Sequence, residues 1–289
     1  MNKIEKMKHE YESIHATDEL KNTVASTLHS HKTKPSAWII NLCAATAAAA
    51  IFVTAMNFSP QLAEAAGDVP ILSSIVKIVT LGKYENKKGG YDAKIVTPKI
   101  EGLIDKNLEN KLNKDFKDNA DALIAAYEKD VKKLEKEYGD DTIHMGITSD
   151  YTVLTDNDDY LALDVYILYT AGSSSTKHTF YTIDKKSGKL LTLKGLFKPD
   201  SDYVTVLSKY IKDEMIRLNN EEGAYFWVDD SVFEGFKKIN PDQNFYINKN
   251  GKLVICFDKY DVAAGAQGSP EFEIPDSVVK DIIVKGMLK

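Results

Sequence analysis

Histidines and paired carboxylates are the side chains in this sequence that could carry acid–base chemistry. His144 and His178 lie in alternating, strand-like runs, and neither is accompanied by a G-x-S-x-G, H-E-x-x-H or cysteine–histidine arrangement. Glu271 and Glu273 are two residues apart, so on a strand they would share one face and could serve a hydrolase as a carboxylate pair. Ordinary edge or loop charges give the same spacing. We therefore predict that the chain is not an enzyme, and an Asp/Glu hydrolase stays the open alternative.

Residues that could bind a metal or a cofactor do not form a convincing site. The run Asp156-Asn157-Asp158-Asp159 lacks the spaced ligands and closing glutamate of an EF-hand, and it predicts a hairpin turn instead. Cys43 and Cys256 fall in separate apolar runs, which predicts neither a disulfide nor a cysteine metal site. The sequence thus predicts no cofactor and no metal. Four more histidines lie in the first 36 residues without a shared helical face, and we interpret them as solvated: His9, His15, His29 and His31.

The composition is that of a folded protein with an acidic balance. Apolar residues make up 43% of the 289 residues, and the formal net charge is −6. This length allows one or two domains with a sizeable core. Arg217 is the only arginine, so no broad basic surface for nucleic acid is expected.

An uncharged apolar stretch, residues 37–58, divides the chain. At about 1.5 Å of rise per residue it is long enough to cross the roughly 30 Å hydrocarbon core of a membrane as one helix. Lys32 and Lys34 precede it, whereas Glu64 and Asp68 follow it, which predicts a cytoplasmic N-terminus and an extracellular C-terminal part. A cleaved signal peptide and a buried helix of a soluble protein are the alternatives, and the long leader favours a retained anchor over a signal peptide.

Small residues after this stretch predict a cleavage site. Pro60 breaks the helix, and Ala63, Ala65 and Ala66 follow in the small-x-small pattern that signal peptidase recognises. The site belongs to a juxtamembrane segment that we place at residues 59–90. The chain is thus expected to carry one membrane crossing with a cutting site beside it.

The first 36 residues predict two short amphipathic helices. Neither helix can bury its apolar stripe within so short a segment, so the stripe must pack on something else. Six lysines against five acidic residues do not make the basic face of a membrane-lying helix, which favours a protein partner. The apolar residues of the two stripes are Ile4, Met7, Tyr11, Ile14, Leu20, Val24 and Leu28.

The part after the apolar stretch predicts an α+β fold, with packed helices and an antiparallel sheet. A long helix is expected over residues 105–138, and a second one from Asp200 or Ser201, because apolar residues recur there at spacings of three and four. A short helix begins at Asp276. Two subdomains are expected, 91–195 and 196–289. Strands are expected at 91–97, 143–155, 160–171, 176–183, 190–193, 225–228, 245–247 and 253–257.

Residues 260–268 form a glycine-containing run of small residues after a predicted buried strand. The run has no Lys-Ser/Thr ending, so it is not a phosphate loop. Loops held by a rigid sheet are where binding usually resides. A connection that merely needs small residues to turn would have the same composition, and both interpretations stay open.

With these features the chain resembles the RsiV-type anti-sigma factors, which are membrane-anchored lysozyme receptors of Gram-positive bacteria. The resemblance rests on the short N-terminal segment with Ile14 and residues 17–20, the single crossing, Val69-Pro70-Ile71-Leu72, and the run FYINKNGKLVICFDKYDVAAGAQGSPEFEIP at residues 245–275. The closing domain also occurs beside cell-wall deacetylase modules, and no such module is identified in this sequence. The alternative function is that of an exported cell-wall-binding or hydrolytic domain with an N-terminal anchor.

The resemblance implies a mechanism and a set of partners. The N-terminal helices would hold an extracytoplasmic-function sigma factor inactive. Lysozyme bound outside would expose the bond between Ala65 and Ala66 to signal peptidase, after which an intramembrane protease would cut the 37–58 helix. After the first 36 residues the chain carries 38 acidic and 31 basic residues, an excess that would favour encounter with a cationic lysozyme.

The resemblance also implies where lysozyme binds, because the family uses loops at a sheet end to block the enzyme's cleft. We expect two such loops, 172–176 and 260–268. Their residues are Gly172, Ser173, Ser174, Ser175, Thr176, Tyr260, Asp261, Val262, Ala263, Ala264, Gly265, Ala266, Gln267 and Gly268.

Overall fold

The structure is a computed structural model that describes residues 76–138, 144–230 and 234–288. The predicted sigma-binding stripes, the apolar stretch 37–58 and the cleavage site at residues 63–66 lie outside these residues. Within the described part, no helix combines the length and the apolar character that a membrane crossing requires. The described residues belong to one compact unit and confirm the mixed α+β fold.

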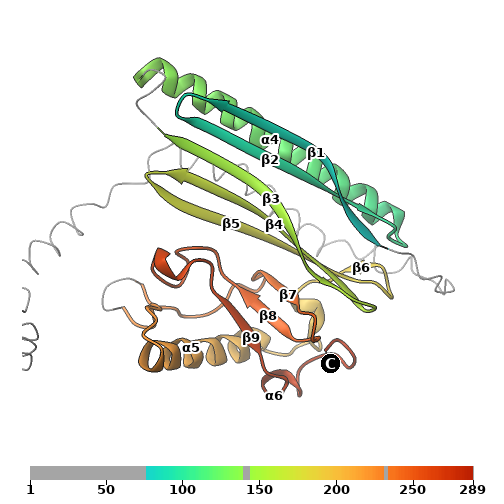
Figure 1. The fold of residues 1–289 in the computed structure, drawn as a ribbon. Helices are drawn as coiled ribbons and strands as arrows, with labels where there is room; N and C mark the ends of the chain where they lie inside the picture. Colours follow the sequence, from blue (N-terminus) through green and yellow to red (C-terminus); the bar gives the residue numbers. More distant parts are fainter. Residues whose placement is uncertain (1–75, 139–143, 231–233, 289) are drawn as a thin grey trace, which may run out of the picture. The chain divides into compact units, whose positions relative to one another are not determined.

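The first layer is a six-stranded sheet with the strand order β1-β2-β3-β4-β5-β6 (Figure 1). All neighbours are antiparallel except β2 and β3, which are parallel, so the predicted purely antiparallel sheet is wrong at this pair. The long helix α4 between them carries the chain back to the same end of the sheet, and only such a crossover allows parallel neighbours. The strands are β1 (Lys77–Lys88), β2 (Tyr91–Glu101), β3 (Met145–Asp156), β4 (Tyr160–Ala171), β5 (Ser173–Asp184) and β6 (Lys189–Leu190).

Helix α4 (Lys106–Tyr138) confirms the predicted long helix to within one residue. Asp105 caps it, because Asp105 Oδ1 accepts hydrogen bonds from the backbone N–H groups of Asn107 (2.9 Å) and Leu108 (3.0 Å). The apolar stripe of the helix packs beside β2, and Phe116 meets Tyr181 of β5 edge-on at 5.1 Å. The buried residues of this stripe are Leu108, Leu112, Phe116, Leu123 and Tyr127.

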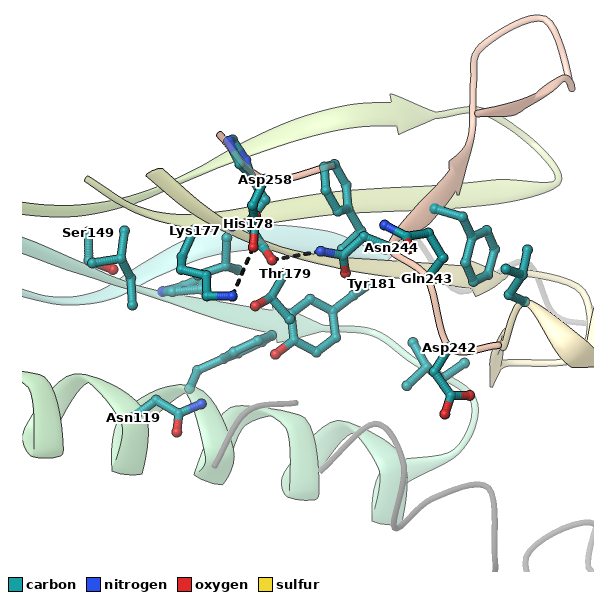
Figure 2. Close-up of a pocket in the computed structure, with 18 of the residues that line it drawn as sticks. Asn119, Ser149, Lys177, His178, Thr179, Tyr181, Asp242, Gln243, Asn244 and Asp258 are labelled. Atoms are coloured by element: carbon teal, nitrogen blue, oxygen red, sulfur yellow. Dashed lines mark hydrogen bonds and ion pairs between the residues drawn. The ribbon is translucent and has the colours of Figure 1, made fainter. Parts of the chain in front are cut away.

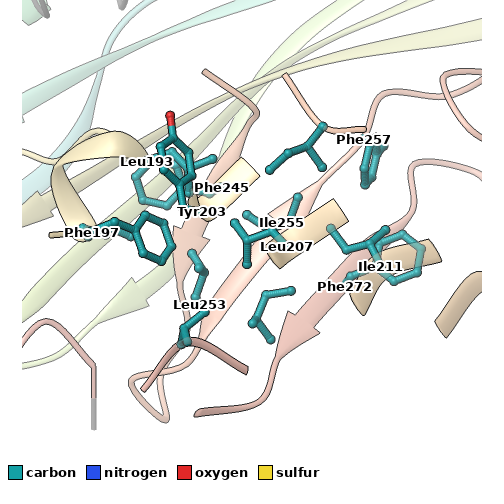
Figure 3. Packing of buried hydrophobic residues seen from close by; sticks show 14 of the residues in the cluster. Leu193, Phe197, Tyr203, Leu207, Ile211, Phe245, Leu253, Ile255, Phe257 and Phe272 are labelled. Carbon is teal, nitrogen blue, oxygen red and sulfur yellow. The ribbon is translucent and has the colours of Figure 1, made fainter. Parts of the chain in front are cut away.

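The C-terminal part forms a second sheet with its own helices. Strands β7 (Phe245–Ile247), β8 (Leu253–Cys256) and β9 (Glu271–Ile274) are antiparallel, and helices α5 (Tyr203–Glu221) and α6 (Asp276–Val279) flank them in sequence. Helix α5 begins after Asp202, whose carboxylate accepts from the Thr205 N–H, so the predicted start at residues 200 or 201 was slightly early. Figure 3 shows the core between α5 and this sheet. Its buried residues include Leu207, Ile211, Met215, Leu253, Ile255, Phe257, Phe272 and Ile274.

The strand predicted at residues 225–228 is wrong. Only a single bridge forms there, between Phe226 and Ala263. The reason is a side chain of α5: Asn219 accepts from the Phe226 N–H and donates to the Phe226 carbonyl, both at 2.8 Å. These two bonds satisfy the backbone of Phe226 without a partner strand.

Candidate functional site

The first predicted loop, residues 172–176, is the tip of a tight hairpin, which we call the β4–β5 tip. Gly172 alone makes the turn, with a φ of 70°, a left-handed conformation that favours glycine. Ser173 already lies opposite Ala171, and Thr176 opposite Leu168, within the strand ladder. The prediction of a loop from 172 to 176 is therefore wrong in form, because the serine run continues β5.

The second predicted segment, residues 260–268, is a true loop that leaves β8 and returns into β9. We call it the 260–268 loop. Tyr260 adopts a φ of 73°, and the ring of Tyr260 covers Gly265. A Cβ on Gly265 would lie 2.4 Å from that ring, so a larger residue there would displace the ring from this position. The last turn of the loop is the short 3-10 helix η3 (Gly265–Gln267).

The structure brings the tip and the loop together, although they are far apart in sequence. The hydroxyl of Tyr260 lies 3.3 Å from Ser173 Oγ, across 87 residues of chain. Lys259 Nζ donates to Ser174 Oγ at 2.8 Å and lies 5.2 Å from the centre of the Tyr260 ring. Tyr260 is nevertheless 45% exposed, so part of its ring faces solvent beside the tip.

Not every residue of the loop can meet a partner. Val262 and Ala263 are buried, and the Val262 carbonyl accepts from the Trp227 N–H at 2.9 Å. These two residues attach the loop to the C-terminal core. Tyr260 and Ala266 are the exposed apolar residues of the loop, and Gly172, Ser173 and Ser175 are exposed at the tip.

His178 of β5 is a residue of this region whose role the sequence analysis missed. His178 Nδ1 lies 2.9 Å from Asp164 Oδ2, and His178 Nε2 lies 3.0 Å from Ser269 Oγ. Burial by itself would lower the pKa of His178, but the hydrogen bond and charge of Asp164, with smaller contributions from Asp258 and Glu271, raise that pKa above its ordinary value. The hairpin register could have placed Asp164 near His178, whereas nothing local in the sequence could have pointed to Ser269.

The edge of β5 near His178 is closed by side chains of the C-terminal part. Asp258 Oδ1 accepts from the His178 N–H at 2.8 Å, and Asp258 Oδ2 pairs with Lys177 at 3.0 Å. Asn244 Nδ2 donates to the His178 carbonyl at 2.9 Å. Figure 2 shows these residues converging on β5. The backbone groups of His178, which is opposite Tyr166 of β4, thus find partners on the other side without a second neighbouring strand.

A cavity of about 320 Å³ borders the same residues. Its walls come from α4, from the six-stranded sheet and from residues 240–245, and Lys177, His178 and Asp258 line one side (Figure 2). Ser269 is not among the lining residues.

The chemistry of the Asp164–His178–Ser269 chain is that of a carboxylate, an imidazole and a hydroxyl in series, as in acid–base triads. Within the described residues, no cluster of three or more histidines, cysteines or carboxylates is arranged to hold a metal ion. The exposed residues of the tip and the loop are Gly172, Ser173, Ser175, Tyr260, Asp261 and Ala266. Among them, Tyr260 is of a residue type that is enriched in protein interfaces.

Comparisons with known proteins agree with this architecture. Residues 84–172 match the family described as Deacetylase PdaC, and residues 194–277 match the family described as a protein of unknown function, DUF3298. The first match corrects the sequence analysis, which identified no segment related to a deacetylase. A crystal structure of a DUF3298 family member from Bacteroides fragilis superposes with a TM-score of 0.56 at 13% identity, covering 74% of this chain and 95% of that one. That similarity supports the fold alone.

A curated relative covers nearly the whole chain. The anti-sigma-V factor RsiV of Bacillus subtilis (strain 168) is 35% identical over 283 residues, which is 98% of this chain and 97% of that protein. The alignment therefore extends beyond the two matched domains into the N-terminal segment. The chain therefore belongs to the RsiV family of anti-sigma factors.

Proposed function

We propose that this protein is a membrane-anchored anti-sigma factor that releases its sigma factor by regulated proteolysis when its exported domain binds lysozyme. The anti-sigma role follows from the family, and it implies a sigma factor as partner. The lysozyme trigger, the membrane anchor at residues 37–58 and the two proteases are our inference from the sequence and the site.

The observation that carries the lysozyme-binding role is the meeting of the tip and the loop. Two segments expected to contact lysozyme lie against one another through Ser173 and Tyr260, at one end of the six-stranded sheet. A protein partner that docks there would contact both segments at once. The half-exposed Tyr260 is the kind of aromatic anchor that often dominates a protein interface.

The sensing step is tested by adding hen egg-white lysozyme to cells that make the chain and following its size. After lysozyme is added, a product cleaved near Ala65 is expected. A double variant carrying Tyr260→Lys and Gln267→Glu should not be cleaved there. If the wild-type chain kept its full length in the presence of lysozyme, the receptor role would be refuted. Unchanged lysozyme affinity in the double variant would refute only the placement of the binding surface.

The anti-sigma step is tested by capture of a sigma factor from cell extracts. The full chain should retain an extracytoplasmic-function sigma factor, and a chain that lacks residues 1–36 should retain none. Equal capture by both chains would place the sigma-binding surface elsewhere.

An exported hydrolytic domain is the second candidate, and the Ser269–His178–Asp164 geometry is the observation that favours it. We do not adopt it, because the neighbouring cavity is lined by His178 but not by Ser269. A fluorophosphonate probe decides the matter. We expect no labelling, whereas labelling that disappears in Ser269→Ala would establish a nucleophilic serine.

A further inference from the structure

Both ends of the 260–268 loop are attached to one residue of β5. At the outgoing end, the backbone N–H of His178 donates to Asp258 Oδ1 at 2.8 Å. At the returning end, His178 Nε2 lies 3.0 Å from Ser269 Oγ. Asp258 and Ser269 flank the loop in sequence, so a single residue fixes where the loop leaves the sheet and where it returns.

The imidazole that makes the second attachment is itself held from the β4 side. Asp164 of β4 binds Nδ1 at 2.9 Å, and the Asp164 side chain is only 9% exposed. The ring stacks on Phe180 at a centroid distance of 5.8 Å, and Tyr166 lies 6.0 Å away on the opposite strand. The six-stranded sheet therefore sets the orientation of the ring, and the loop is fastened to a preset group.

We propose that His178 is a positioning residue for lysozyme recognition, because its backbone and its imidazole together hold the 260–268 loop against the β4–β5 tip. The effect on lysozyme binding rests on the proposed function, whereas the attachment of the loop to His178 is a property of the protein without a partner. It assigns to His178 the task of holding the loop in place, which differs from catalysis and from simple burial. The position of the exposed Tyr260 ring in the loop depends on His178.

The attachment is expected to persist in both protonation states of the imidazole. A neutral ring donates from Nδ1 to Asp164 and accepts at Nε2 from the Ser269 hydroxyl, whereas a charged ring donates at both nitrogens. Lys177, Asp258 and Glu271 are the other charged groups that act on this site. The conformation of the 260–268 loop should therefore change little with pH, whereas removal of the His178 imidazole or of the Ser269 hydroxyl should change it strongly.

The test uses four variants of the full chain. His178→Phe keeps a ring for stacking and removes both nitrogens, and Ser269→Ala removes only the hydroxyl. Ser269→Thr keeps the hydroxyl and should rescue. Thr155→Val is the matched control. The Thr155 hydroxyl donates to the Ile247 carbonyl at 2.8 Å, so this substitution removes a different hydrogen bond between the six-stranded sheet and β7.

Two measurements separate the attachment from its consequence. Amide hydrogen exchange of residues 260–268 in the free chain should rise about tenfold in His178→Phe and in Ser269→Ala, and stay unchanged in Ser269→Thr and Thr155→Val. Affinity for hen egg-white lysozyme should fall about tenfold in the first two variants, mainly through faster dissociation. Amide exchange in β8 reports whether each variant is folded. If His178→Phe is not folded, the result for Ser269→Ala alone tests the attachment.

Each result has one meaning. Unchanged loop exchange in Ser269→Ala would overturn the attachment, whether or not lysozyme binds. Raised exchange with unchanged lysozyme affinity would overturn the role in recognition. A wild-type chain that does not bind lysozyme would overturn the proposed function, and the exchange data would still decide the attachment.

Discussion

The β4–β5 tip is held by a regular ladder of backbone hydrogen bonds, whereas the 260–268 loop is held mainly by side-chain contacts, with one backbone bond from Trp227 to Val262. From Ala171 opposite Ser173 onward, every residue of the tip has a cross-strand partner. The loop instead depends on side chains at His178, Lys259 and Tyr260, together with the burial of Val262 and Ala263 in the C-terminal core. The two neighbours on the proposed binding surface are thus built by different means.

This difference predicts unequal tolerance of substitution. The hydrogen bonds of a strand ladder are made by backbone groups, so a tight hairpin tolerates most side-chain changes as long as the turn residue can adopt its φ. A loop fastened by side chains loses its shape when one fastening is removed. We therefore expect the loop to be the fragile half of the surface and the tip the robust half.

Gly265→Ala is expected to have the largest effect, because the added Cβ would lie 2.4 Å from the Tyr260 ring and must displace it. The displaced ring loses Ser173, and lysozyme affinity should fall on the order of 30-fold, as when an interface anchor is lost. Titration calorimetry with hen egg-white lysozyme measures this. Ala266→Ser, at the exposed neighbouring residue, is the control and should leave the affinity unchanged. An equal loss of affinity in Ala266→Ser would show that binding does not depend on the contact between Gly265 and Tyr260.

Gly172→Ala tests the tip. Its φ of 70° would cost an alanine about 1–2 kcal/mol of stability, and the ladder should keep the tip in place with about a threefold loss of lysozyme affinity. Gly223→Ala is matched to it, since Gly223 has a φ of 69° and equally open surroundings but lies after α5. Urea unfolding should show similar losses of stability in both variants, and only Gly172→Ala should alter binding. A loss of affinity as large as that of Gly265→Ala would erase the contrast between tip and loop.

The bond between the two halves is expected to be weak. The hydroxyls of Ser173 and Tyr260 are exposed and 3.3 Å apart, so the coupling energy between Ser173→Ala and Tyr260→Phe in a double-mutant cycle of unfolding should be about 0.5 kcal/mol or less. A coupling above about 1.5 kcal/mol would mean that the tip and the loop fold as one element.

The same contrast explains what the sequence could predict. The tip strands and α4 follow from alternation and from three-four spacing, which are local patterns, and the structure agrees with them closely. The parallel pairing of β2 with β3 was missed because it depends on where a helix returns the chain. The strand expected at 225–228 failed because Asn219, a residue of α5, satisfies the backbone of Phe226.

For the site, composition singled out the 260–268 segment and the family resemblance singled out both segments, but neither showed how they are fastened. Ser269 meets His178 across 91 residues, and Lys259 meets Ser174 across 85. Such partners are set by tertiary packing and leave no spacing in the sequence. A histidine facing an aspartate two positions along on the paired strand is the one part of the network that a register argument could have reached.

The smallest expected effect is a pH dependence of stability at the loop's attachment. Because the folded-state pKa of His178 is raised above its ordinary value of about 6.5, the charged ring contributes stability that is fully present below about pH 6.5 and is lost as pH rises through the folded-state pKa. Asp164, Asp258 and Glu271 favour the charged ring, and Lys177 beside Asp258 offsets part of this. The free energy of unfolding, from urea titrations followed by tryptophan fluorescence, should therefore decline slightly across that range in the wild type. His178→Phe should remove this part of the slope, and Thr155→Val should keep it. A slope that survives in His178→Phe would assign the titration to another group and leave the attachment of the loop independent of charge.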